Sequence, residues 1–329
     1  MTKKIVAVLA LSLVSSSAFA SQAKNIISGG GDGGNILGVG GMNGSFYTND
    51  EYNMFYNPAF INGMKKWAIV ENGSTSGTSG GFVTDAGAFN LGVFLNRSGL
   101  TAGRGGQPID IVLGGDMGVK WGVGLTHTLS EGGPATTRLK AGAMVADFEP
   151  FVHYTLKNTN GAASETKDSG MTVGTRYHWG DWTPYAAYTT TKATTAGTEA
   201  ANSASTWGLG MGRNAKFGDV TMDYAISYWN GKTAADVKSQ SVPVNMNFSA
   251  KAASWFTARA GFAHNLITRG AAAAGTSTTL GGSFHMGNAD LDMVIGNADA
   301  PVGLGAAADT NAFGFDGNFF SQVGLTYRM

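Results

Sequence analysis

Apolar residues recur at every second position over most of the chain. Val119, Trp121, Val123 and Leu125, for example, alternate with glycine or polar residues. A two-residue period is typical of a β-strand with one apolar face. The stretches that show it are 66–71, 80–84, 88–96, 108–114, 118–128, 137–147, 150–158, 169–179, 182–192, 204–213, 219–229, 241–249, 254–264, 277–286, 290–296 and 319–329. The pattern predicts sixteen strands, or fourteen if the first two stretches belong to the N-terminal segment.

The connections between these stretches alternate in length. Short turns are predicted at 115–116, 147–150, 180–181, 214–219, 250–254 and 287–289, and longer polar loops at 97–107, 129–136, 159–168, 193–203, 230–240, 265–276 and 297–318. Outer-membrane barrels have short periplasmic turns, long extracellular loops and an even number of strands. The sequence therefore predicts an all-β fold, a transmembrane antiparallel up-and-down β-barrel over residues 66–329.

The N-terminus carries a pattern of its own. Lys3 and Lys4 precede an apolar run over 5–14, and Ala18-Phe19-Ala20 follows. A basic start, a short apolar core and an A-x-A site define a secretory signal peptide. A run of this length is too short to span a bilayer. We expect residues 1–20 to be cleaved after Ala20.

Residues 21–65 differ from the strand-forming region. Residues 28–34 are rich in glycine, and residues 51–61 contain four aromatic residues and an Asn-Pro turn. One interpretation is a disordered leader. The other is a segment folded back into the barrel as a plug, which we favour because aromatic side chains left in water are costly.

Composition excludes several classes of protein. The chain has 50 glycines, 7 prolines and no cysteine, so it has neither a disulfide framework nor thiolate metal chemistry. Its formal net charge is zero, which argues against a nucleic-acid partner. The expected surroundings are outer-membrane lipid and lipopolysaccharide.

The face opposite the apolar stripe carries charges at mid-strand positions. Lys or Arg facing hydrocarbon costs about 2–4 kcal/mol at the bilayer midplane, so these side chains should face a water-filled lumen. The predicted pore-lining residues are Lys120, Arg138, Lys140, Arg176, Asp223, Arg259, Asp290, Asp292 and Arg328. Their excess of basic residues predicts a weak preference for anions. Alternatively, the charges pair with one another and fill the lumen.

Aromatic residues lie where strands meet turns. Trp179, Trp182 and Trp255 adjoin short turns, and Tyr327 lies close to the C-terminus. Tyr228 and Trp229 lie at the opposite strand ends. Membrane barrels carry an aromatic girdle at each interface, and we assign these residues to the two girdles.

No pattern of catalytic residues stands out. The five histidines lie at 127, 153, 178, 264 and 285, without the spacing of a metal site. There is no G-x-S-x-G motif either. We therefore expect no enzymatic activity, no metal and no cofactor.

Two stretches resemble known families. The end of the chain, with Val323, Leu325, Tyr327 and Met329 on one face, resembles the insertion signal that the barrel-assembly machinery reads in Gram-negative outer-membrane proteins. That family usually ends in Phe, where this chain has Met. A barrel has no exposed sheet edge, so a strand can end the chain.

The second resemblance lies in the N-terminal segment. Tyr56-Asn57-Pro58-Ala59, after a glycine-rich leader, is similar to the N-P-A segment of FadL-like transporters of hydrophobic compounds. In that family the segment belongs to a hatch that plugs a fourteen-stranded barrel. The chain as a whole also resembles the major outer-membrane proteins of deltaproteobacteria.

Three functions follow as hypotheses. The first is a porin-like channel in the outer membrane of a Gram-negative bacterium, for passive diffusion of small polar solutes. The second is a FadL-like transporter of hydrophobic molecules, with residues 21–65 as its hatch. The third is a structural or adhesive surface barrel that transports nothing. A homo-oligomer is compatible with each.

Overall fold

The computed structural model describes residues 45–49, 51–64, 66–73, 77–96, 107–129, 135–159, 166–195, 198–199, 203–270, 275–298 and 319–329. The predicted signal peptide and residues 21–44 lie outside these ranges. The strands are β1 (Trp67–Gly73), β2 (Gly77–Ala86), β3 (Phe89–Leu95), β4 (Gln107–Asp116), β5 (Lys120–Leu129), β6 (Ala135–Met144), β7 (Phe148–Thr159), β8 (Thr166–Tyr177), β9 (Trp182–Thr195), β10 (Thr198–Glu199), β11 (Ala204–Phe217), β12 (Val220–Lys232), β13 (Lys238–Ala253), β14 (Phe256–Gly270), β15 (Thr276–Met286), β16 (Ala289–Ala298) and β17 (Phe319–Arg328).

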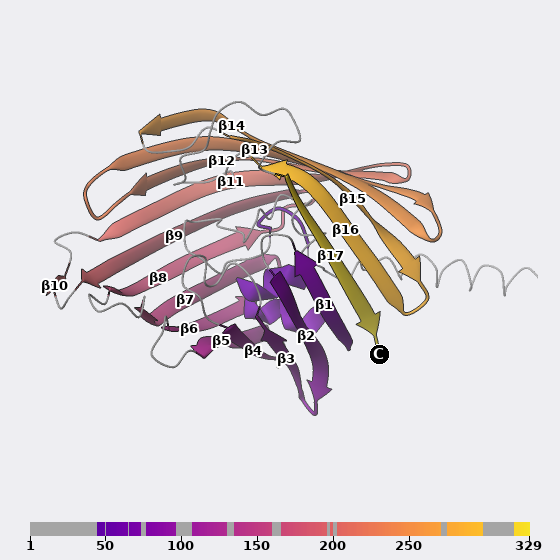
Figure 1. Cartoon of the computed structure of the whole chain (residues 1–329), viewed down its shortest axis with the longest axis horizontal. Helices are drawn as coiled ribbons and strands as arrows, with labels where there is room; N and C mark the ends of the chain where they lie inside the picture. The colour runs from indigo at the N-terminus through magenta and orange to yellow at the C-terminus, as the bar shows by residue number, and fades with distance from the viewer. Residues whose placement is uncertain are drawn as a thin grey trace, which may run out of the picture.

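These strands close into one antiparallel barrel (Figure 1). Each wall strand pairs with the next one along the chain, and β1 closes the barrel against β17 in a register that runs from Trp67 opposite Arg328 to Gly73 opposite Gln322. The two-residue strand β10 pairs only with the last two residues of β9. The neighbour of β9 in the wall is β11, which pairs with it over ten residues. Sixteen strands of the described chain therefore form the wall, which confirms the predicted up-and-down barrel.

All sixteen predicted stretches overlap an observed strand, but two predicted turns are displaced. Gly115 and Asp116 end β4, and that turn lies at 117–119, around Gly118. The other displaced turn is the one before β7. The chain turns at 145–147, where Ala146 has a positive φ of 52°, so Glu149 and Pro150 belong to β7 and not to the connection. Other turns at this end of the barrel use glycine for the left-handed conformation, as at Gly180 and Gly218. We identify this end, with its short turns and both barrel-strand termini, as the periplasmic end.

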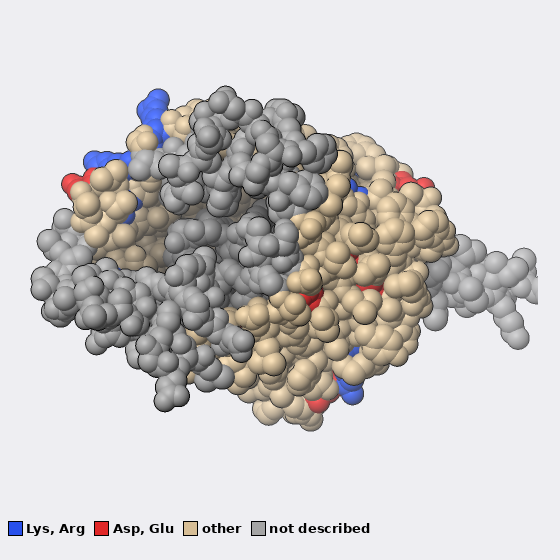
Figure 2. Space-filling model, in the orientation of Figure 1, with Lys and Arg blue, Asp and Glu red and all other residues tan. Residues whose placement is uncertain are grey.

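The two faces of the wall differ sharply. Large apolar side chains remain exposed on the outer face along the whole circumference, among them Val70, Ile111, Leu139, Leu209, Leu280 and Leu325. The residues between them point inward and are mostly polar. In Figure 2 the charged side chains gather mainly near the ends of the strands, and most of the visible wall is uncharged. The outer face thus suits hydrocarbon, and the inner face suits water.

Two short 3-10 helices, η2 (Glu51–Phe55) and η3 (Pro58–Gly63), precede the barrel strands. In Figure 1 they lie within the outline of the barrel, and η3 contacts β3, β4, β5 and β6. Asn57 caps η3 by accepting a hydrogen bond from the Ala59 amide, and Pro58 occupies the first helical position, where its missing N–H costs nothing. No helix among the described residues is long and apolar enough to cross a membrane.

Candidate functional site in the barrel lumen

Residues 45–49 and 51–64 pack against the inner wall. Tyr52, Met54, Phe55 and Ile61 are buried in one cluster with inward-facing residues of β1 to β4, including Trp67. The hydroxyl of Tyr52 donates a hydrogen bond to Glu71 of β1. Burial of four large apolar side chains contributes several kcal/mol of stabilisation, at roughly 1.5–3 kcal/mol each. The described part of the N-terminal segment is therefore held inside the barrel.

A second cluster joins the same segment to the opposite strands. Phe46, Tyr47 and Tyr56 are buried with Phe151 of β7 and Tyr185 of β9. Ala187 of β9 and Ala225 and Trp229 of β12 complete this cluster. The Phe46 ring lies 5.1 Å from that of Tyr56 and 5.3 Å from that of Tyr185. The segment thus reaches from the β1 side of the lumen to the β12 side.

Inward-facing glycines form the seat of η3. Gly114, Gly122 and Gly142 lie directly opposite one another on β4, β5 and β6. A Cβ at Gly122 would overlap the backbone of Pro58, and a Cβ at Gly142 would overlap the Asn57 side chain. Any larger residue in this row would displace η3. The glycine row therefore shapes the wall for the helix that packs on it.

The stretch Tyr56–Ala59, which contains the N-P-A sequence, lies at the glycine row. Asn57 donates from Nδ2 to the carbonyl oxygens of Ala143 (3.3 Å) and Pro150 (3.4 Å). The backbone oxygen of Tyr56 lies 2.6 Å from Nε2 of the buried His153. Tyr56, Asn57 and Ala59 are fully buried, and Pro58 is also buried. Their assignment to a plug stays a prediction.

One group of predicted lumen charges lies on β4 to β8. Lys140 forms an ion pair of 3.2 Å with Asp110, and both side chains are almost fully buried. Arg138 is buried beside it and donates to the Thr155 hydroxyl at 3.2 Å. Both bases lie on the inner face of β6, because they alternate with the exposed Leu139.

Arg176 ties the N-terminal segment to the wall. Its guanidinium pairs with Glu149 of β7 and donates to the Thr48 carbonyl oxygen (2.7 Å) and to Asn49 Oδ1 (2.6 Å). It also lies 4.8 Å from the ring centroid of Phe60. His178 lies 2.9 Å from the other oxygen of Glu149. One buried cation thus contacts three parts of the chain.

The remaining predicted charges lie mainly on the β12 to β17 side. Asp290 pairs with Arg328 and lies 2.8 Å from His285, while Asp292 accepts from Ser283. Arg259 donates to Ser249 and Ser283, and Asp223 accepts from Asn214 and Asn247. Lys120 is half-buried at the periplasmic start of β5. These positions are inward by alternation, but their role in lining a pore stays a prediction.

Three inward carboxylates were not expected from the sequence. Glu71, Asp110 and Glu149 are all buried on the inner face. The alternation around Asp110 could have revealed it, whereas Glu149 was assigned to a turn and Glu71 to a strand end. When these three carboxylates are added, the named lumen residues comprise as many acidic as basic side chains. The excess of basic residues predicted from the sequence therefore disappears.

The predicted girdle residues divide between the two faces. Trp179, Trp182, Trp255 and Tyr327 are exposed near the periplasmic end. Tyr228 lies near the other end of β12 and packs on Trp207 at 5.3 Å. Trp229 was wrongly placed in a girdle, since it points into the lumen and donates to Ser227 at 2.9 Å. Neighbours in a strand face opposite sides, so Tyr228 and Trp229 cannot share one.

The C-terminal strand places its alternating residues outward. Val323, Leu325 and Tyr327 are exposed on the outer face of β17, and Met329, which follows the strand, is exposed as well. The strand pairs with β1 on one side and β16 on the other, so it is not an open edge. An apolar outward face is the arrangement that lipid requires, and its reading by an assembly machinery stays a prediction.

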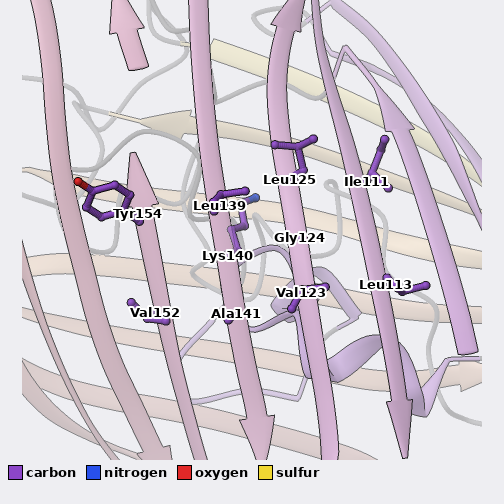
Figure 3. A pocket seen from close by; sticks show the side chains of 10 residues that line it. All are labelled: Ile111, Leu113, Val123, Gly124, Leu125, Leu139, Lys140, Ala141, Val152 and Tyr154. Atoms are coloured by element: carbon purple, nitrogen blue, oxygen red, sulfur yellow. The ribbon is translucent and has the colours of Figure 1, made fainter. Parts of the chain in front are cut away.

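The outer wall also carries a hollow of about 420 Å³ over β4 to β7 (Figure 3). It is lined by Ile111, Leu113, Val123, Gly124, Leu125, Leu139, Lys140, Ala141, Val152 and Tyr154. Nearly all of these side chains are apolar and face outward, and Lys140 borders it while its charged end is buried toward Asp110. The hollow is therefore a feature of the lipid-facing surface and not of the lumen.

The fold resembles solved outer-membrane proteins. Against a bacterial polysaccharide outer-membrane secretin the TM-score is 0.50 with 8% identity, over 80% of this chain and 98% of that one. Against OmpT of Vibrio cholerae the TM-score is 0.45 with 11% identity, over 80% of this chain and 95% of that one. Against an anion-selective porin from Comamonas acidovorans the TM-score is 0.41 with 11% identity, over 80% of this chain and 99% of that one. No protein-family model and no curated protein matches the chain.

The closed sixteen-stranded barrel, its apolar outer face and the likeness to the secretin define the class. The chain has the fold of a Gram-negative outer-membrane β-barrel of the porin-like type. This fold supports a location in the outer membrane.

Proposed function

We propose that the protein is a channel through which small polar solutes diffuse passively across the outer membrane. The observation that carries this proposal is the polar inner wall of β12 to β17, on the side away from the glycine seat. Ser241, Thr279 and Thr326 are among the polar side chains on this inner face. A polar inner face is typical of membrane barrels that enclose a water-filled channel.

Ion selectivity should be small. The sequence alone suggests a weak anion preference, but Glu71, Asp110 and Glu149 add negative charge to the same wall. Lys140, Arg176 and Arg328 are each paired with a carboxylate. Paired charges exert a weaker net field on ions than rings of one sign. We therefore propose a channel that discriminates mainly by solute size.

Liposome swelling tests this function. Vesicles containing the mature protein should swell in isotonic solutions of small neutral sugars, with rates that fall as the sugar grows. The reversal potential in a salt gradient should lie close to zero. Vesicles that fail to swell even with a pentose would contradict the proposal, whereas a strong reversal potential would contradict only the charge argument.

A second candidate function rests on a separate observation. The aromatic cluster around Phe46, Tyr56 and Phe151 makes part of the lumen apolar, and the glycine row seats η3 on the wall. This arrangement suits a FadL-like transporter in which residues 21–65 act as a hatch over a hydrophobic route. Such a protein would bind a hydrophobic fluorophore within the barrel and pass little sugar.

A further inference from the structure

One arginine lies on the outer, lipid-facing side of the barrel wall. Arg213 of β11 follows the exposed Met211 by two residues and lies between Gly212 and Asn214, which face inward. Its cross-strand partners are Trp182 of β9 and Tyr224 of β12. All three side chains therefore share the outer face, where a cation needs a specific explanation.

The two aromatic partners hold the guanidinium in place. Its central carbon lies 5.0 Å from the Trp182 ring, and Nη1 donates to the Tyr224 hydroxyl at 3.2 Å. The rings of Trp182 and Tyr224 are 6.4 Å apart and nearly perpendicular. Stacking on a ring and one hydrogen bond fix the plane of the guanidinium before any ligand arrives.

The remaining donors of Arg213 lack partners within the described chain. Nε is buried without a hydrogen bond, and Nη2 makes none to the described residues. No described carboxylate lies within ion-pair distance. The positive charge is therefore not neutralised by the described protein, in contrast to the lumen bases Arg176 and Arg328.

The position of Arg213 along the membrane normal indicates its surroundings. Trp182 begins β9 beside the exposed Trp179, and the exposed Phe217 ends β11. Aromatic residues at strand ends mark the membrane interface, here on the periplasmic side. An arginine costs about 0–1 kcal/mol near an interface, and phospholipid phosphates lie at this depth. Guanidinium groups match the geometry of phosphate oxygens.

We propose that Arg213, Trp182 and Tyr224 form a binding site for the phosphate of an anionic phospholipid headgroup in the periplasmic leaflet. The Nη2 group donates to a phosphate oxygen, while Trp182 packs beside the glycerol region and Tyr224 orients the guanidinium. The site depends only on the outer face of the barrel. It is independent of what passes through the lumen.

Native mass spectrometry of the full mature protein in detergent, titrated with phosphatidylglycerol, tests the site. We expect Arg213→Gln to raise the dissociation constant about tenfold, since a hydrogen bond to a charged group is lost. Lys216→Gln is the matched control, because Lys216 lies on the same strand but on the inner side and is exposed. It should bind phosphatidylglycerol like the wild type.

Two further arms complete the test. Tyr224→Phe, which removes only the hydroxyl, should weaken binding several-fold and serves if Arg213→Gln does not fold. Inorganic phosphate at millimolar concentration should not displace the lipid. Equal binding by wild type and Arg213→Gln, equal weakening by both glutamine variants, or displacement by free phosphate would each overturn the proposal.

Discussion

Replacing Arg176 with Met should destabilise the protein by about 3–5 kcal/mol, because it leaves the buried Glu149 without its main counter-charge. The same change removes the hydrogen bonds to Thr48 and Asn49, which hold the start of the N-terminal segment. We therefore expect a lower urea midpoint for unfolding from lipid vesicles, followed by tryptophan fluorescence. Proteases should also cleave the 45–64 segment faster in the folded barrel.

Two variants control this prediction. Arg176→Lys keeps the charge but loses the forked geometry, so it should fall between wild type and Arg176→Met. The double change Arg176→Met with Glu149→Gln removes both charges and should recover part of the lost stability. A urea midpoint for Arg176→Met equal to that of the wild type would show that the pair contributes nothing to stability.

Replacing Gly122 with Ala should dislodge η3 from its seat. The new Cβ would overlap the backbone of Pro58 and Ala59, and backbone atoms cannot move aside as a flexible side chain does. Overpacking of this kind costs about 1–3 kcal/mol. We expect increased protease access to residues 45–64 and a less steady single-channel conductance than in the wild type, because the segment is no longer held against the wall and can move within the lumen.

Gly124→Ala is the matched control, two residues away on the same face of β5. Its Cβ would meet the Lys140 side chain at 3.5 Å, an ordinary contact. Protease access and conductance should therefore match the wild type. If both alanine variants behave alike, the glycine row has no special role in seating the segment.

The barrel was predictable from the sequence because lipid imposes a period of two on every strand. The outward series Val119 to Leu125 and Val323 to Tyr327 show this period in the sequence and remain on the outer face in the structure. The turn before β7 was misplaced because Ala146, and not a glycine or asparagine, adopts the left-handed conformation there. Local patterns thus predict the wall but not each boundary.

The contents of the lumen were harder to predict because they depend on long-range contacts. Nothing near Gly122 in the sequence indicates that Pro58 packs on it, and nothing near Arg176 indicates its bonds to Thr48 and Asn49. Polarity alone identified inward bases such as Lys140. It did not identify their partners, so the predicted excess of positive charge disappeared once Glu71, Asp110 and Glu149 were placed.

Single-channel conductance of the mature protein in a planar bilayer tests the central proposal most directly, compared with a variant that lacks residues 21–60. An open channel predicts steady conductance in the intact protein and larger steps in the shortened one. Absence of conductance in the intact protein would contradict passive diffusion. Conductance that appears only after the deletion would favour the hatch of a hydrophobic-molecule transporter, and silence in both would favour a barrel that transports nothing.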